Sequence, residues 1–249
     1  MATVVVTPQG YFEEVGTEIV VTPQGIYESN NVAAPTNLRF EEVYKPAIGG
    51  ESYLLDNFTY DVADRTTLTS KLPTEINKYG NAWAQPNTGF VIRESVDEIA
   101  AVNDTGQCQA IIRLNQYQPL LIHGRVTLNP SGTLGLTKKA DTDRDGVLCQ
   151  MSSSGAATIY TQSGNAHTWR ASGALGTPVK PYTMEMVATG TFSSLTWVND
   201  GDGNDSASTV SYSTNKGWDY YNAGIRVNSS GSNGFTRQFS QFAVWRYVA

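Results

Sequence analysis

Residues 122–128 read Ile-His-Gly-Arg-Val-Thr-Leu, and residues 183–188 read Thr-Met-Glu-Met-Val-Ala. In both stretches apolar and polar side chains roughly alternate. Successive side chains of a β-strand point to opposite faces of its sheet, so an alternating strand buries one face and leaves the other in water. These two stretches therefore predict half-buried strands of a layered β protein.

Short apolar runs continue this pattern from Tyr53 to the end of the chain, separated by Gly, Asn, Asp, Ser or Pro. Their spacing of roughly ten residues is typical of sandwiches and barrels. The expected strands are residues 89–94, 109–114, 120–128, 133–138, 147–151, 158–161, 183–188, 195–199, 224–227 and 239–248. One short helix is expected at residues 97–102. We predict an all-β fold, with an antiparallel jelly-roll β-sandwich over residues 51–249.

Composition and charge restrict the function classes. The chain has 249 residues, of which 16% are charged, and its net charge is −6 from 17 basic and 23 acidic side chains. It has no basic cluster, so we expect no nucleic-acid partner. No apolar run approaches the roughly 18 residues of a membrane-spanning helix, and no secretory leader is recognisable. We therefore expect no membrane partner either.

The two cysteines, Cys108 and Cys149, lie in separate predicted strands. They can form a disulfide only if those strands are neighbours, so their pairing stays open. Two partly buried thiols are the simpler expectation.

A repeat occupies the N-terminus: residues 3–13 read TVVVTPQGYFE and residues 18–28 read EIVVTPQGIYE, an offset of 15 residues. In each copy a β-branched run precedes Thr-Pro-Gln-Gly. Proline presets the second position of a turn, and glycine accepts the positive φ that ends it. Each copy therefore predicts a strand and a turn.

Two such copies cannot form a core of their own, so this N-terminal arm needs a partner surface. Its strands either join the sandwich or pair with equivalent arms or another protein by strand addition. Residues 28–50 look like a linker, which favours the second alternative and an arm domain at residues 1–50. We expect a homo-oligomer, with a trimer favoured. The expected assembly residues are Val4, Val5, Val6, Pro8, Gly10, Ile19, Val20, Val21, Pro23 and Gly25.

Three motifs carry a family resemblance: Leu55-Asp56-Asn57-Phe58, Gly80-Asn81-Ala82-Trp83 and the closing run from Phe239 to Trp245. With them, the chain from Leu55 to Tyr247 resembles the concanavalin A-like lectin/glucanase (laminin-G-like) sandwiches found in phage virion proteins. The absent leader, low charge and repeated arm are similar to phage head-decoration, fibre or tail-adaptor proteins. This resemblance implies a structural protein of the virion, bound through its arm to other virion proteins. The alternative is a carbohydrate-binding adhesion module for host-surface glycans.

Catalytic patterns are missing from the sequence. The glucanases of this superfamily present Glu-x-Asp-x-x-Glu on one strand, because retaining chemistry needs two carboxyl groups about 5 Å apart. The nearest acidic cluster, residues 94–98, has another spacing and is expected to be a solvated turn. His123 lies in a predicted strand and His167 in a polar loop, and no Gly-x-Ser-x-Gly or nucleotide-binding motif occurs. We predict that the protein is not an enzyme and has no organic cofactor.

One string suggests a metal. Asp141, Asp143 and Asp145 occupy alternate positions before Gly146, as in calcium loops, but the twelfth position is Ser152 rather than Glu. Calcium is one interpretation, and an Asp-rich hairpin that caps its own backbone is the other. The acidic stretch 199–205 has a looser pattern and is expected to be a loop.

Sugar binding needs aromatic faces beside hydrogen-bonding groups. Two polar, turn-rich segments, residues 165–170 and 218–222, offer both. Trp83, Trp197 and Trp245 are instead expected to be packing residues. The candidate glycan-binding residues are Asn165, Trp169, Arg170, Trp218, Tyr220 and Tyr221.

Overall fold

The structure is a computed structural model, and the chain divides into two compact units, Met1–Ala47 and Ile48–Ala249. Each unit is considered by itself. The described parts of the chain are residues 5–7, 10–12, 18–22, 25–29 and 49–247, except 88, 102–106, 115–119, 130–131, 140–144, 164–165, 190, 200–204, 207, 214–221 and 229–236. The side chains of these residues are described from Ser52 onward, except those of 86, 87, 107, 139, 228 and 247. No helix in these parts is long and apolar enough to cross a membrane.

Each sequence repeat of the N-terminal unit forms its own hairpin. Strand β1 (Val5–Thr7) pairs antiparallel with β2 (Gly10–Phe12), and β3 (Glu18–Thr22) pairs antiparallel with β4 (Gly25–Ser29). The predicted strands are therefore present, and each pairs within its own copy. Val4, Pro8 and Pro23 lie outside the described residues, and the expected role of the arm in assembly stays a prediction.

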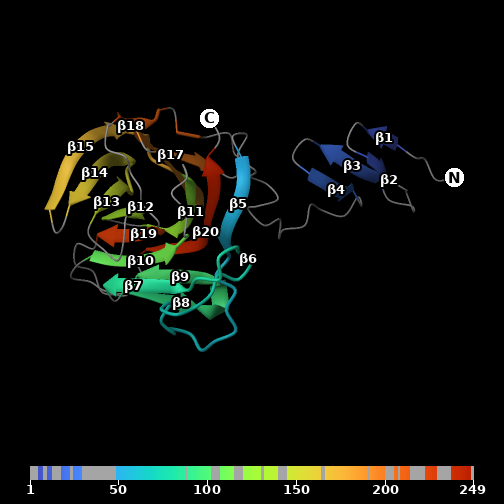
Figure 1. Ribbon diagram of the computed structural model, residues 1–249, viewed down its shortest axis with the longest axis horizontal. Helices are drawn as coiled ribbons and strands as arrows, with labels where there is room; N and C mark the ends of the chain where they lie inside the picture. Colours follow the sequence, from blue (N-terminus) through green and yellow to red (C-terminus); the bar gives the residue numbers. More distant parts are fainter. Residues whose placement is uncertain are drawn as a thin grey trace. The chain divides into compact units, whose positions relative to one another are not determined.

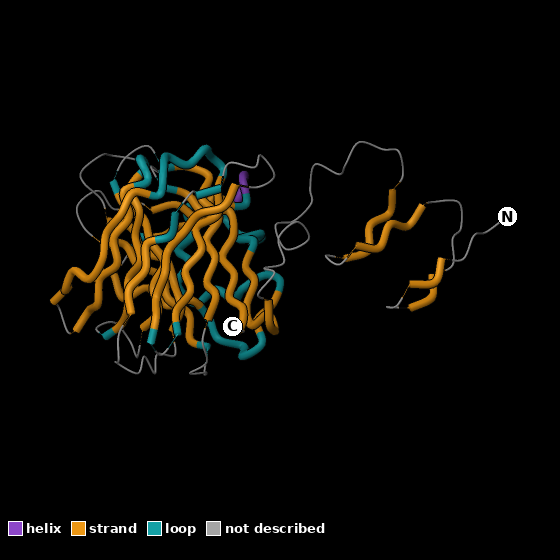
Figure 2. Tube along the Cα trace, turned by 90° about the horizontal axis from the view of Figure 1, so that it is seen from above, coloured by secondary structure: helices purple, strands orange, loops and turns teal. Residues whose placement is uncertain are grey.

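The larger unit consists of two antiparallel sheets, with seven and nine strands among the described residues (Figures 1 and 2). The seven-stranded sheet runs in the order β15 (Ala166–Ala174), β14 (Ala156–Ser163), β13 (Gly146–Ser152), β12 (Thr133–Lys139), β19 (Asn222–Asn228), β10 (Gln107–Arg113) and β7 (Trp83–Asn87). The nine-stranded sheet runs in the order β18 (Val210–Ser213), β17 (Phe192–Asn199), β16 (Tyr182–Ala188), β11 (Leu120–Leu128), β20 (Gln238–Tyr247), β5 (Gly49–Asp56) and β6 (Ile76–Asn77), with β9 (Glu98–Ala101) beside β20 and β8 (Phe90–Arg93) beside β9.

The core lies between the two sheets, as the alternating sequence predicted. In β16, Met184 and Met186 are buried in it, whereas Glu185 lies on the opposite face of the sheet. In β11, Ile122 and Val126 face the core in the same way. Each such side chain contributes about 1.5–3 kcal/mol when it leaves water. The all-β, antiparallel jelly-roll sandwich is thus confirmed.

Two local predictions were wrong. Residues 97–102 do not form a helix: a 3-10 turn at Glu94–Val96 ends at Asp97, whose φ is 50°, and the next residues form strand β9. Pairing with β8 and β20 and burial of Ile99 favour the extended backbone there. The acidic run at residues 94–98 is a solvated turn, as expected.

The second wrong prediction concerns His167, which lies in strand β15 rather than in a loop.

The two cysteines do not form a disulfide. Cys108 lies in β10 and Cys149 in β13, and strands β19 and β12 lie between them. Three strand spacings separate the positions by about 14 Å, about twice the Cα separation that a disulfide spans. Both side chains are buried, and burial raises the pKa of the Cys149 thiol.

A buried carboxylate joins the two sheets. Asp56 ends β5 in the nine-stranded sheet, and its carboxylate accepts a hydrogen bond from the indole Nε1 of Trp83, in β7 of the seven-stranded sheet, at 2.7 Å. It also accepts from the Phe58 amide at 2.8 Å, the Tyr60 hydroxyl at 2.6 Å and the Thr74 hydroxyl at 3.2 Å. Burial raises the pKa of Asp56, and these four hydrogen bonds act in the opposite direction.

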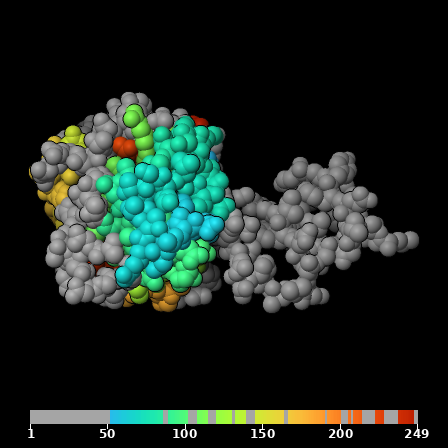
Figure 3. All heavy atoms as spheres, turned by 90° about the horizontal axis from the view of Figure 1, so that it is seen from below, coloured from blue at the N-terminus to red at the C-terminus, as the bar shows by residue number. Residues whose placement is uncertain are grey.

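These bonds also hold the segment that follows β5. Phe58 has a φ of 57°, a left-handed backbone that costs free energy in a bulky residue and needs support from its surroundings. The surrounding rings supply it: Phe58 packs against Trp83, and Trp83 packs against Phe242 of β20. Figure 3 shows the segment between β5 and β10, coloured from cyan to green, gathered on one face of the molecule.

We expect Asp56→Ala to lower the free energy of unfolding by about 3 kcal/mol, because it leaves the buried Trp83 and Phe58 N–H groups without an acceptor. Urea unfolding followed by tryptophan fluorescence measures the change. Asp61→Ala is the matched control, since Asp61 is exposed and its loss should cost less than about 0.5 kcal/mol. Equal stability of the two variants would contradict the assigned role of Asp56.

Candidate functional site

Strand register defines the outer face of the seven-stranded sheet, which is the face turned away from the core. Core residues such as Ala110, Ile225 and Cys149 alternate along their strands with residues of this outer face. Paired positions then form rows that run across the strands. The first row is Gln109, Arg226, Gly135, Gln150, Thr158 and Ser172, the second is Ile111, Gly224, Thr137, Leu148, Tyr160 and Trp169, and the third is Arg113, Asn222, Lys139, Gly146, Gln162 and His167.

Two glycines lie in the middle of this face. A Cβ atom at Gly135 would collide with the Cys149 carbonyl, and one at Gly224 would collide with the Ala110 carbonyl. Neighbouring strands therefore approach too closely for any side chain at these two positions. The two glycines leave room beside the backbone for longer side chains from adjacent positions, and the neighbouring outer-face residues Thr137, Leu148 and Arg226 are themselves buried.

One of these long side chains belongs to Arg226. Its Nη1 lies 3.1 Å from Nε2 of His167, which comes from the edge strand β15. In a flat sheet these two positions would lie about 19 Å apart across four strand spacings and about 14 Å apart along the strands. The two side chains cannot span that distance, so the contact requires the sheet to curl toward its outer face. A guanidinium only donates, so Nε2 of His167 accepts and the proton of its ring is on Nδ1.

An aromatic group lies at the same edge. The rings of Tyr160 and His167 have centroids 6.2 Å apart, and Trp169 is the cross-strand partner of Tyr160. The Trp169 side chain is 58% exposed, unlike Trp83, which is buried. The sequence identified Trp169 as a candidate, whereas it did not identify Tyr160 or Arg226. Tyr160 and Arg226 come near the predicted residues through the register of the strands, and the sequence pattern does not predict that register.

Arg170 is directed away from this group. A bulge between Ile159 and Tyr160 shifts the register opposite it, and its Nε donates to the Thr161 hydroxyl at 2.8 Å. Its guanidinium lies 5.6 Å from the ring centroid of Tyr212 in β18, a strand of the other sheet. Arg170 therefore links the edges of the two sheets, on the side opposite Trp169.

The other predicted site residues are less fully described. Asn165, Trp218, Tyr220, Tyr221, Asp141 and Asp143 lie outside the described residues, while Asp145 is exposed just before β13. The described flanks of these segments do meet, because Lys139 is paired with both Gly146 and Asn222, and Gly146 with Gln162. The described residues that flank the segments predicted to bind sugar and calcium thus lie at one end of the seven-stranded sheet.

Calcium stays a prediction. Across the portions of the chain that the structure describes, no group of three or more His, Cys, Asp or Glu side chains is arranged to hold a metal.

A second polar pair lies on the outer face of the nine-stranded sheet. His123 Nε2 of β11 is 3.2 Å from Glu185 Oε1 of β16, and the His123 ring packs on Trp245 with centroids 4.5 Å apart. Burial lowers the pKa of His123 to about 3. Burial raises the pKa of Glu185 to about 7, and the charge of Asp205 adds to this effect. Near neutral pH the imidazole is therefore uncharged, so the two side chains do not form a full ion pair.

Two solved structures are similar to this chain in fold, as antiparallel β-sandwiches. A protein of unknown function with a galectin-like fold from Bacillus subtilis matches 80% of this chain and 98% of its own, with 10% identity and a TM-score of 0.50. The exoplasmic/lumenal domain of VIP36 matches 78% of this chain, at 7% identity and a TM-score of 0.50; 93% of that domain is covered in its Ca²⁺-bound form and 90% in its Ca²⁺/Man2-bound form. No protein-family model matches the chain, and no curated protein matches its sequence.

The pair of His123 and Glu185 predicts a specific pH dependence. The raised pKa of Glu185 makes folding stability fall as pH rises from about 4.5 to about 7, while the lowered pKa of His123 makes it rise from about 3 to about 6.5. The two trends oppose each other over most of the shared range. Glu185→Gln removes the first trend, so its stability relative to wild type should increase by about 2 kcal/mol between pH 4.5 and 7.

Urea unfolding at a series of pH values from 3 to 8 measures this difference. A constant difference between the two proteins across that range would show that Glu185 does not titrate as assigned.

Proposed function

We propose that this protein is a carbohydrate-binding module of the lectin type. Its sugar site is the outer face of the seven-stranded sheet, at the edge that carries Trp169 and Tyr160. The observation that carries the proposal is the exposed indole of Trp169, next to Tyr160 and close to the polar pair of His167 and Arg226. Sugar rings stack their apolar faces on aromatic rings while their hydroxyl groups need donors and acceptors, and this edge supplies both.

Other polar side chains extend the same surface. Gln150, Thr158 and Gln162 lie on the outer face between Arg226 and the edge strand, and all three are half-buried. Amides and hydroxyls of this kind orient a ligand without adding charge. The VIP36 domain, which shares the fold, has been solved with Ca²⁺ and Man2 bound. A shared fold alone does not establish function, so the proposal depends on the chemistry of this face.

The proposal includes no catalytic step, in keeping with the missing glucanase motif. Calcium would bind through Asp141, Asp143 and Asp145, of which Asp145 comes just before strand β13. Such an ion would hold the neighbouring segments rather than react, since Ca²⁺ prefers oxygen ligands and has no redox chemistry of its own. Sugar binding that is unchanged by a chelator would show that calcium has no part in it.

A second function is proposed for the N-terminal arm, as an attachment or self-association device. Met1–Ala47 forms a compact unit whose described strands make two separate two-stranded hairpins. Isolated hairpins of this size are marginal in water, which favours a partner for their unpaired edges. Several copies held together would also strengthen weak sugar binding. A capsid-decoration or fibre component of a virion, anchored by this arm, is the specific setting that the sequence resemblance suggests.

We expect Trp169→Ala to weaken glycan binding by about tenfold or more with little change in stability, because the indole is exposed and removes little core packing. A glycan array followed by calorimetry on the bound glycans measures the effect. Leu72→Ala is the control, since Leu72 is equally exposed but lies outside both sheets. If both variants bind as wild type does, the site is placed wrongly.

Removal of residues 1–47 should convert an oligomer into a monomer if the arm is the assembly device. Light scattering on the full chain and on a chain that begins at Ile48 measures both masses. The truncated chain keeps all of the larger compact unit, so it should remain folded. A full-length monomer, or an oligomer that survives truncation, would argue against this role.

A further inference from the structure

Arg226 is a buried cation that uses only part of its hydrogen-bonding capacity. Its side chain is 2% exposed, and Nη1 contacts His167. Its Nε and Nη2 atoms are also buried and have no hydrogen-bond acceptor among the described residues. Burial lowers the pKa of Arg226 to about 10, so the guanidinium still carries its charge at neutral pH.

The two unused donors form a specific geometry. Nε–H and one Nη2–H point in parallel along one edge of the planar guanidinium, and such an edge matches the two oxygens of a carboxylate. Burial of this edge without an acceptor costs free energy, because its donors lose water and gain nothing in return. Among the described residues, burial is the cause that lowers the Arg226 pKa, and no carboxylate of these residues is paired with the guanidinium.

We propose that this edge of Arg226 binds the carboxylate of an acidic sugar, of the uronic or sialic acid type. The inference rests on the proposed sugar-binding function and specifies its ligand class. The proposed sugar site and the Arg226 side chain are connected. His167 contacts Arg226 and also the ring of Tyr160, and Trp169 is the cross-strand partner of Tyr160. The guanidinium and the aromatic side chains thus lie on one face of the sheet, where an acidic oligosaccharide would meet both.

The burial of Arg226 sets how the ligand reaches it. His167 belongs to β15, which pairs with β14 alone among the described strands of its sheet and is exposed along most of its length. Since Arg226 is only 2% exposed, neighbouring side chains must move before a carboxylate can reach Nε and Nη2. A carboxylate bound there leaves water as well, which strengthens its charge-assisted hydrogen bonds to the guanidinium.

The test compares acidic oligosaccharides with neutral counterparts of the same size, on wild type and two Arg226 variants. The probes are oligogalacturonate and its carboxyl-reduced form, sialyllactose and lactose, and a sulfated oligosaccharide. Arg226→Met keeps the length of the side chain without its charge, and such replacements of buried charges are often neutral or stabilising. Arg226→Lys keeps the charge but loses the two parallel donors.

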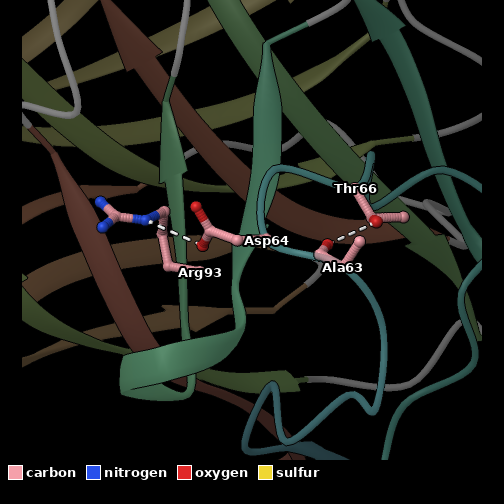
Figure 4. Close-up of polar contacts among 4 residues, drawn as sticks. All are labelled: Ala63, Asp64, Thr66 and Arg93. Carbon is pink, nitrogen blue, oxygen red and sulfur yellow. Dashed lines mark hydrogen bonds and ion pairs between the residues drawn. The ribbon is translucent and has the colours of Figure 1, made fainter.

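Arg93→Met is the matched control. Arg93 pairs with Asp64 at the surface, with Nε 3.3 Å from Oδ1, and takes no part in the outer face of the seven-stranded sheet (Figure 4). This variant should bind every probe as wild type does.

We expect wild type to bind at least one carboxylated probe on the order of tenfold to a hundredfold more tightly than its neutral counterpart. Both Arg226 variants should lose most of this preference, while Arg226→Met melts no lower than wild type. Calorimetric titration measures the affinities, and thermal unfolding with and without probe measures folding. Should Arg226→Met fail to fold, the Arg226→Lys variant still decides the question.

Three results would overturn the inference. Equal binding of acidic and neutral probes by wild type, with neutral binding still dependent on Trp169, would leave the sugar-binding function intact and remove the acidic ligand. A preference that persists in the Arg226 variants, or that is confined to the sulfated probe, would exclude the carboxylate pairing. Failure of every probe to bind would overturn both the inference and the proposed function.

Discussion

The sandwich depends on a buried carboxyl group that accepts hydrogen bonds from both of its layers. The Asp56 carboxylate lies where the end of β5 meets β7 of the opposite sheet, and its bond to the Trp83 indole is one of the polar links between the two layers. Aromatic rings surround that bond and keep water away, which strengthens it and makes its partners costly to separate. Because the same carboxylate also holds the chain at Phe58 and Thr74, one side chain positions the sheets and the segment between them.

At the other edge of the seven-stranded sheet the constraint is geometric. Gly135 and Gly224 let neighbouring backbones approach closely, and the sheet curls until Arg226 meets a residue four strands away. The rim that results combines an exposed indole with a buried cation. An exposed indole and a buried guanidinium thus lie on the same face of the sheet.

Much of the fold was readable from the sequence, and the site only in part. Alternation in residues 183–188 and 120–128 predicted strands because one face of each is buried. Strand β15 gave no such signal: it is an edge strand that is mostly exposed, so its residues do not alternate and His167 was assigned to a loop. The short run at 97–102 fits a helix or a strand equally well, and pairing with β8 and β20 decides for the strand. Arg226 and His167 are 59 residues apart in the sequence, so neither composition nor local pattern predicts their contact.

The tandem hairpins of the arm have a consequence for how this chain can vary. Each copy closes its own pairs, Val6 with Tyr11 in the first and Val20 with Tyr27 in the second. A duplication or deletion of one 15-residue unit therefore changes the reach of the arm without altering the register of the remaining hairpin. The arm can be lengthened or shortened in whole units, whereas a single-residue insertion in the sandwich would turn core side chains of a strand outward. Natural variation in length should accordingly concentrate before Gly49.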